Sequence, residues 1–132
     1  MQDISFVLSP PITNEQVNQL FAASWPDHKP RDFGPILTRG LAYLCAYEGE
    51  RLVGFVNLAW DGGIHAFLLD ITVHPDVQHR GIGQQLVREA VTAAQTRGIS
   101  WLHVDYEPQL EAFYRGCGFK FTNAGLMRLD GE

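Results

Sequence analysis

The chain has 132 residues, of which 45% are hydrophobic and 19% are charged, with eight Phe and three Trp. This length and composition predict a single domain over residues 1–132 with one apolar core, and they exclude a disordered or fibrous protein. The formal net charge of −5 and the pI near 5.4 argue against binding to nucleic acid through its phosphates, so we expect no nucleic-acid partner.

No apolar run approaches the roughly 20 residues that a membrane span requires, so we expect no membrane partner. The N-terminal sequence "MQDISFVLSPP" lacks the basic segment of a signal peptide, which favours a cytoplasmic protein. Cys45 and Cys117 lie far apart in the sequence, each in apolar surroundings. Without a secretory context we expect them to be reduced core residues and not a disulfide.

The first half of the chain has the patterns of a strand, helices and then a meander. Residues 4–8 are typical of a first strand, and Thr13 and Gln16 after them have the spacing of a helix capping box. The apolar residues of that helix share one face: Val17, Leu20 and Phe21. A poorer pattern around 31–40 suggests a second short helix. Runs joined by "EGER" and "DGG" then predict antiparallel strands.

The second half begins with the longest helix. Its apolar residues recur at three- and four-residue spacing: Ile82, Leu86, Val87, Ala90, Val91 and Ala94. A strand over 99–106 follows, so a parallel crossover is expected between residues 66–74 and 100–105. A shorter helix after Pro108 and two last strands, "FKFT" and "LMRL", complete the prediction.

The stretch "TVHPDVQHRGIGQQLV" contains Gly81 and Gly83 where a strand pattern gives way to a helix pattern. The first-turn amides of a helix have no partner within it, and glycine lets a phosphate approach the backbone. The loop is therefore a candidate pyrophosphate cradle, with Arg80 as an added donor; a simple tight turn is the alternative. The Lys-Ser/Thr of a P-loop is missing, and Leu86 replaces the third glycine of the dinucleotide motif.

The order of motifs resembles the GNAT superfamily of acyl-CoA-dependent N-acetyltransferases. Gln78, Arg80, Gly81 and Gly83 fill that family's Gln/Arg-x-x-Gly-x-Gly/Ala pattern, and "FYRGCGF" resembles its second signature, an aromatic helix ending in a Gly-Phe turn. The resemblance covers nearly the whole chain. It implies an α/β GNAT fold, with a mixed, mostly antiparallel sheet, a central splayed pair of parallel strands, and flanking helices.

The resemblance also implies acetyl-CoA as the cosubstrate. Amides of the loop would bind its pyrophosphate, while two backbone positions on the preceding strand would pair with the pantetheine arm as though it were another strand. The residues implied in cofactor binding are Ile71, Val73, Val77, Gln78, His79, Arg80, Gly81, Ile82, Gly83 and Gln84.

Four residues are candidates for catalysis. Tyr114 occupies the place of the family's usual tyrosine, which would protonate the departing thiolate; a core tyrosine is the alternative. Seven residues earlier the family often has an asparagine that contacts the pantetheine, but this chain has Glu107, which cannot donate as an amide does. Asp70, Asp105 and Glu107 are candidates to attract an ammonium and pass its proton to water. Asp105 and Glu107 share a face if the strand extends that far.

We therefore expect acetyl transfer to a primary amine by direct attack in a ternary complex. The acceptor is a small molecule or a peptide, and the acidic chain favours a cationic one. Two alternatives are an acyl-CoA-binding sensor or partner module without turnover and an interaction subunit that uses the fold alone. The five histidines match no zinc pattern, so no metal is expected. A homodimer remains open.

Overall fold

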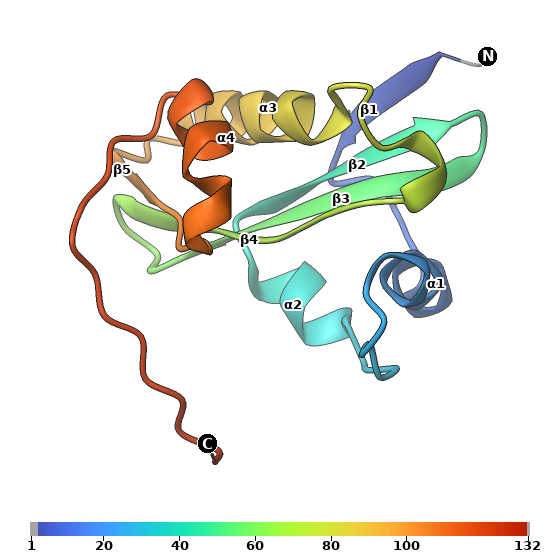
Figure 1. Ribbon diagram of the computed structural model, residues 1–132, viewed down its shortest axis with the longest axis horizontal. Helices are drawn as coiled ribbons and strands as arrows, with labels where there is room; N and C mark the ends of the chain where they lie inside the picture. Colours follow the sequence, from blue (N-terminus) through green and yellow to red (C-terminus); the bar gives the residue numbers. More distant parts are fainter. Residues whose placement is uncertain (1–2, 132) are drawn as a thin grey trace.

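The computed structural model describes residues 3–131. A single sheet lies between two layers of helices, with α1 and α2 on one face and α3 and α4 on the other (Figure 1). The strands are β1 (Ile4–Leu8), β2 (Ala42–Glu48), β3 (Arg51–Trp60), β4 (His65–Val73) and β5 (Trp101–His103). The helices are α1 (Asn14–Ser24), α2 (Gly34–Arg39), α3 (Ile82–Thr96) and α4 (Glu111–Gly116), with 3-10 turns η1 (Pro75–Val77) and η2 (Pro108–Leu110).

The sheet has the strand order β1-β2-β3-β4-β5. The first three junctions are antiparallel, as the meander pattern predicts, and β4 pairs with β5 in parallel. Pairing between β4 and β5 covers only residues 65–67 and 101–103, although β4 continues to Val73. The expected α/β architecture is thus confirmed, with a parallel pair that is joined at one end only.

Helix α1, whose start the capping box predicts, covers one face of the sheet. Thr13 Oγ1 accepts from the amide of Gln16 at 3.1 Å, and Gln16 Oε1 accepts from the amide of Thr13 at 2.8 Å. The buried residues of α1 pack with aromatic residues of the sheet and the following loop into one core: Val17, Leu20, Phe21, Phe33 and Phe55. The local pattern therefore places α1 by burying its apolar face.

The other core lies between α3 and the sheet. The α3 residues that are buried follow the helical period: Ile82, Leu86, Val87, Ala90, Ala93 and Ala94. Gly54 of β3 lies beneath this helix, and a Cβ there would come within 3.0 Å of Leu86 Cδ1. A larger residue at this position would therefore require Leu86 or the neighbouring strand to shift by a few tenths of an ångström. The helix fixes the loop that precedes it, because Val77 and Ile82 are both buried in this core.

The strand expected over 99–106 is shorter than its pattern suggests. Side chains do continue to alternate, with Leu102, Val104 and Tyr106 packed against the α3 core. The assigned strand nevertheless ends at His103, where pairing with β4 ends. An alternating pattern records which face is buried, whereas a strand also needs a neighbour for its backbone bonds.

The two strands expected at the C-terminus are not formed. Among the described residues, neither "FKFT" nor "LMRL" is part of a strand. In Figure 1 this segment leaves the end of α4, passes β5 and extends away from the rest of the molecule. The prediction was wrong because alternation alone does not supply a partner strand.

Both cysteines are free, with Cys45 buried and Cys117 half-buried, as expected from the sequence. Each helix within residues 3–131 is too short or too polar to cross a membrane.

Candidate active site

The loop between β4 and α3 presents backbone at the N-terminus of α3. Gly81 is the N-cap and has a φ of +76°, a conformation in which a side chain is strained. His79 also has a positive φ, +63°. The hydrogen bond from the amide of Gln85 to the carbonyl of Gly81, at 3.1 Å, closes the first turn of α3. The amides of Ile82 and Gly83 precede it and have no acceptor within the helix.

Gly83 is not required by the packing of the chain itself. A Cβ at this position would lie 3.6 Å from Cζ of Phe113 and 3.7 Å from Cγ2 of Val73, which are ordinary contacts. Its φ also lies outside the left-handed region. The fold thus explains the glycine at Gly81 but leaves Gly83 without a steric reason.

Two polar side chains of the loop already have partners. Arg80 forms an ion pair with Glu48 of β2, with 3.3 Å between Nη1 and Oε2. Gln78 Nε2 donates to the carbonyl of Val73 at 3.5 Å. These contacts tie the loop to the ends of β2 and β4. The role of Arg80 as a phosphate donor stays a prediction, and it would require the guanidinium to share or leave Glu48.

Strand β4 contains a bulge at Asp70. Its register with β3 shifts between Phe55 and Asn57, and Asp70 has a φ of +59°. The carboxylate lies 3.6 Å from Arg31, measured between Oδ2 and Nη2. Arg31 in turn lies over the ring of Phe33, 4.6 Å from its centroid. Asp70 is therefore held by a cation from the loop before α2.

Beyond the bulge, β4 runs on without β5. Ile71 and Val73 pack their side chains on the α3 core, and no β5 residue pairs with this part of β4 in the described chain. The carbonyl of Val73 also accepts from Ser24 Oγ at 3.3 Å. Such a parallel strand edge is able to pair with an extended ligand, as the resemblance implies.

A pocket of about 400 Å³ lies where the chain leaves β5. It is lined by Asp105, Tyr106, Glu107, Leu110, Tyr114 and Leu126. It thus contains three of the four candidate catalytic residues, and Asp70 is not among its lining residues. The strand does not extend to Glu107, so a shared strand face is not what brings it beside Asp105. Glu107 instead precedes η2, where the chain turns into α4.

Tyr114 is the buried member of this pocket, with 4% of its surface exposed. Its ring stacks on Tyr106, with centroids 4.8 Å apart and planes 21° from parallel. Burial raises the pKa of Tyr114, and the neighbouring Cys117 and Asp105 raise it further. The phenol therefore stays protonated at neutral pH, as a proton donor must, although the same burial also suits a core residue.

The sequence analysis did not assign three residues near the bulge to the site: Trp25, Arg31 and Asn57. Trp25 Nε1 donates to Thr72 Oγ1 at 3.1 Å, and Arg31 pairs with Asp70, but both come from a Pro-rich segment without periodicity. Asn57 of β3 is 3% exposed, and its Oδ1 has no hydrogen-bond partner within the described residues. A lone amide in the apolar run "VGFVNLAW" is the one signal that could have identified a special position.

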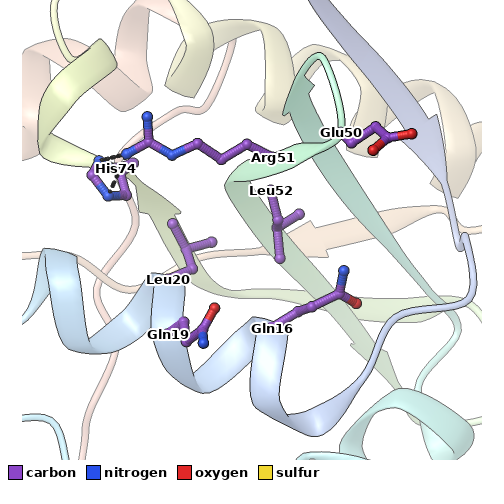
Figure 2. A pocket seen from close by; sticks show the side chains of 7 residues that line it. All are labelled: Gln16, Gln19, Leu20, Glu50, Arg51, Leu52 and His74. Atoms are coloured by element: carbon purple, nitrogen blue, oxygen red, sulfur yellow. Dashed lines mark hydrogen bonds between the residues drawn. The ribbon is translucent and has the colours of Figure 1, made fainter.

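A second pocket, of about 220 Å³, lies between α1 and the start of β3 (Figure 2). It is lined by Gln16, Gln19, Leu20, Glu50, Arg51, Leu52 and His74. Arg51 Nη2 lies 3.0 Å from His74 Nε2 and donates to Asp76 Oδ2 at 2.8 Å, and this bond lowers the pKa of Asp76. None of the expected cofactor or catalytic residues lines this pocket.

Within residues 3–131, no three His, Cys, Asp or Glu side chains gather as metal ligands.

Residues 12–119 match the model of the acetyltransferase (GNAT) family, and the chain belongs to this family. The uncharacterized N-acetyltransferase ycf52 of Porphyra purpurea is 35% identical over 72 residues, which are 54% of this chain and 41% of that protein. The chloroplastic GCN5-related N-acetyltransferase 1 of Arabidopsis thaliana is 29% identical over 115 residues, 85% of this chain and 58% of that protein. The chain spans less than two thirds of the length of either relative.

Solved structures show the same fold. A GNAT-family acetyltransferase from Streptococcus pneumoniae superposes with a TM-score of 0.79 at 25% identity, over 98% of this chain and 100% of that one. The protein AAC(6')-Iy, in complex with the bisubstrate analog CoA-S-monomethyl-acetylneamine, has a TM-score of 0.78 at 20% identity, over 98% and 99% of the two chains. The sheet and helices therefore form a GNAT fold.

Proposed function

We propose that the protein transfers an acetyl group from acetyl-CoA to a primary amine by direct attack in a ternary complex. The observation that carries this proposal is that the pairing of β4 with β5 ends at Phe67 and His103, in a fold that also has a glycine-containing N-terminus of α3 and a pocket with a buried tyrosine. Family membership supports acyl transfer in general. A protein of the same fold, AAC(6')-Iy, binds an analog that contains CoA.

The residues of the loop fit the pyrophosphate of the cosubstrate. Gly81 leaves open space where a side chain would stand, and Gly83 is a glycine that the chain's own packing does not need. The amides at the start of α3, with the positive end of its dipole, favour an anion there. The part of β4 that does not pair with β5, at Ile71 and Val73, would hold the pantetheine arm.

The cosubstrate supplies an activated acetyl group as a thioester. Tyr114 would then donate its phenolic proton to the departing sulfur, and its raised pKa keeps that proton available throughout the neutral range. Stacking on Tyr106 fixes the ring plane, so the hydroxyl is presented in one orientation. The pocket would thus place a general acid beside the reacting bond.

The amine must lose a proton before it attacks, because it is mostly an ammonium at neutral pH. Asp105 and Glu107 lie in the pocket with Tyr114 and are our candidates to attract the ammonium and receive its proton through water. Asp70 lies on β4 beyond its pairing with β5, but it is not among the residues that line the pocket, and it is paired with Arg31. We therefore place the base in the pocket and expect a cationic acceptor.

A two-part experiment tests this function. Calorimetry measures acetyl-CoA binding, and a panel of amines is screened for thiol release from acetyl-CoA. Binding at micromolar affinity together with release that depends on one class of amine supports the proposal. Binding without release by any amine identifies a sensor or partner module, and failure to bind refutes both functions.

A further inference from the structure

The carboxylate of Glu48, at the end of β2, lies between two arginines. Its Oε2 accepts from Nη1 of Arg80 in the loop before α3, at 3.3 Å, and its Oε1 lies 3.9 Å from Nη1 of Arg51 at the start of β3. Only 20% of the Glu48 side chain and 26% of the Arg80 side chain are exposed. Because water reaches these two charges only in part, their attraction is less screened than that of a fully exposed pair.

Arg51 has partners on its other side as well. Its Nη2 donates to Asp76 Oδ2 at 2.8 Å, and Asp76 belongs to η1, in the same loop as Arg80. Figure 2 shows the Arg51 side chain extending from the start of β3 to His74, which directly follows β4. A chain of opposite charges therefore runs from Asp76 through Arg51 and Glu48 to Arg80, the last of them at the start of α3.

The position of Arg80 brings this chain of charges to the proposed phosphate site. Arg80 precedes Gly81, the N-cap of α3, and so stands beside the amides that would bind the pyrophosphate. Glu48 thus keeps a negative charge next to a site that is proposed to take an anion. The carboxylate and the phosphate attract the same guanidinium, and the two like charges repel each other. Binding of the cosubstrate has to overcome both effects.

We propose that Glu48 competes with the pyrophosphate of the cosubstrate for Arg80, and that Arg51 retains Glu48 when the pyrophosphate takes Arg80. This inference rests on the proposed function, because it takes acetyl-CoA to be the ligand of the loop. In the complex the Arg80 guanidinium turns to the phosphate, and Arg51 leaves the half-buried carboxylate with a cation. The product CoA has the same pyrophosphate, so Glu48 weakens its binding as well and favours its release.

Calorimetric titration with CoA tests the competition without acetyl transfer. Glu48→Gln and Glu48→Ala are each expected to bind CoA about 5-fold more tightly, which is the scale of a partly exposed ion pair. Neither should be more stable than the wild type to thermal unfolding without ligand, because the ion pair is lost, so a general effect on the fold would not produce the gain in affinity. Glu50→Gln is the matched control, because it removes the same charge from an exposed residue of the adjacent turn and should leave the affinity unchanged. Unchanged or lower CoA affinity in the folded Glu48 variants would overturn the proposal.

Double variants show whether the effect passes through the two arginines. The gain from Glu48→Gln should be smaller beside Arg80→Gln, because only the repulsion between carboxylate and phosphate then remains. An equal gain would mean that Glu48 acts through its charge alone, and competition would be refuted. Arg51→Gln should weaken CoA binding more in the wild-type background than beside Glu48→Gln, because Arg51 acts by holding the released carboxylate. Equal losses would refute this role of Arg51.

The same titrations separate this inference from the proposed function. A wild type that binds no CoA refutes the proposed function and this inference together. A wild type that binds CoA, with Glu48 variants that do not bind it more tightly, refutes this inference alone. The KM of the amine should not change in Glu48→Gln, since Glu48 is not among the residues that line the Tyr114 pocket.

Discussion

Arg31 lies 3.6 Å from Asp70, measured between Nη2 and Oδ2, whereas the other two candidate carboxylates, Asp105 and Glu107, line the Tyr114 pocket. The ion pair is partly exposed and contributes about 0–1 kcal/mol to folding. Asparagine tolerates the positive φ of Asp70 better than most residues do. Asp70→Asn is therefore a mild substitution that removes the charge and retains the bulge.

We predict that the acceptor kinetics depend on the carboxylates of the pocket. Asp105→Asn or Glu107→Gln should raise the acceptor's KM or lower kcat by about 10-fold or more, while Asp70→Asn changes either by less than about 3-fold. Steady-state kinetics with the best amine measure this, with acetyl-CoA affinity as the control. The reverse order, with Asp70→Asn the most damaging, would make Asp70 the base and Arg31 a group that the amine displaces.

Glu107→Gln also tests a second role of this position, because the variant places an amide where the family often has one. If it tightens acetyl-CoA binding and leaves the amine kinetics unchanged, Glu107 is a weakened contact to the pantetheine. Asp105 is then the remaining carboxylate of the pocket.

The Tyr114→Phe variant should bind acetyl-CoA as the wild type does but turn over about 100-fold more slowly or worse, because the proton donor is lost. The ring is retained, so its stacking on Tyr106 and its burial remain. Single-turnover rates and calorimetry on the same preparation measure the two effects. An unchanged rate with a good acceptor would show that Tyr114 is a core residue.

Gly83→Asp should abolish acetyl-CoA binding and leave the protein folded. The new carboxylate would occupy the phosphate site, while an acidic residue in the first turn of α3 is favourable to the helix itself. Gly83→Ala is the matched control for folding, since its Cβ makes only ordinary contacts with Phe113 and Val73. Calorimetry and thermal unfolding compare the two variants. Wild-type affinity in a folded Gly83→Asp protein would mean that the loop is only a turn.

Stability should fall in alkaline solution because of two neighbouring groups of β2, the buried Cys45 and the half-buried Tyr47. Burial raises the pKa of Cys45 from 9.0 to about 12, and burial together with Cys45 raises that of Tyr47 from 10.0 to about 12. The unfolded chain loses these protons first, so their contribution is complete below about pH 9 and is lost as pH rises toward 12.

Urea unfolding between about pH 8 and 11 measures this loss. Cys45→Ala should show a shallower decline than the wild type, because one of the groups is missing. An identical slope in the two proteins would assign the alkaline instability to other residues, such as the buried Tyr114, whose pKa is also raised.

The sequence by itself determined the elements whose causes are local. The capping box of Thr13 and Gln16, the helical period of α3 and the glycine at Gly81 each depend on a few neighbouring residues, and all appear where they were expected. The three meander strands follow for the same reason, since tight turns join them. The order of the two sequence signatures was enough to predict the family.

Only the tertiary structure decided which distant residues meet. Nothing in the pattern of residues 66–74 shows that Asp70 lies on a bulge beside Arg31, or that Asp105 and Glu107 reach Tyr114 through the turn after β5. The alternating patterns of residues 104–106 and of the C-terminal segments 119–122 and 126–129 likewise do not show whether a strand forms. Alternation shows that a segment has one apolar face, but a strand forms only where another edge supplies its hydrogen bonds, and that edge is set by the packing of the whole chain.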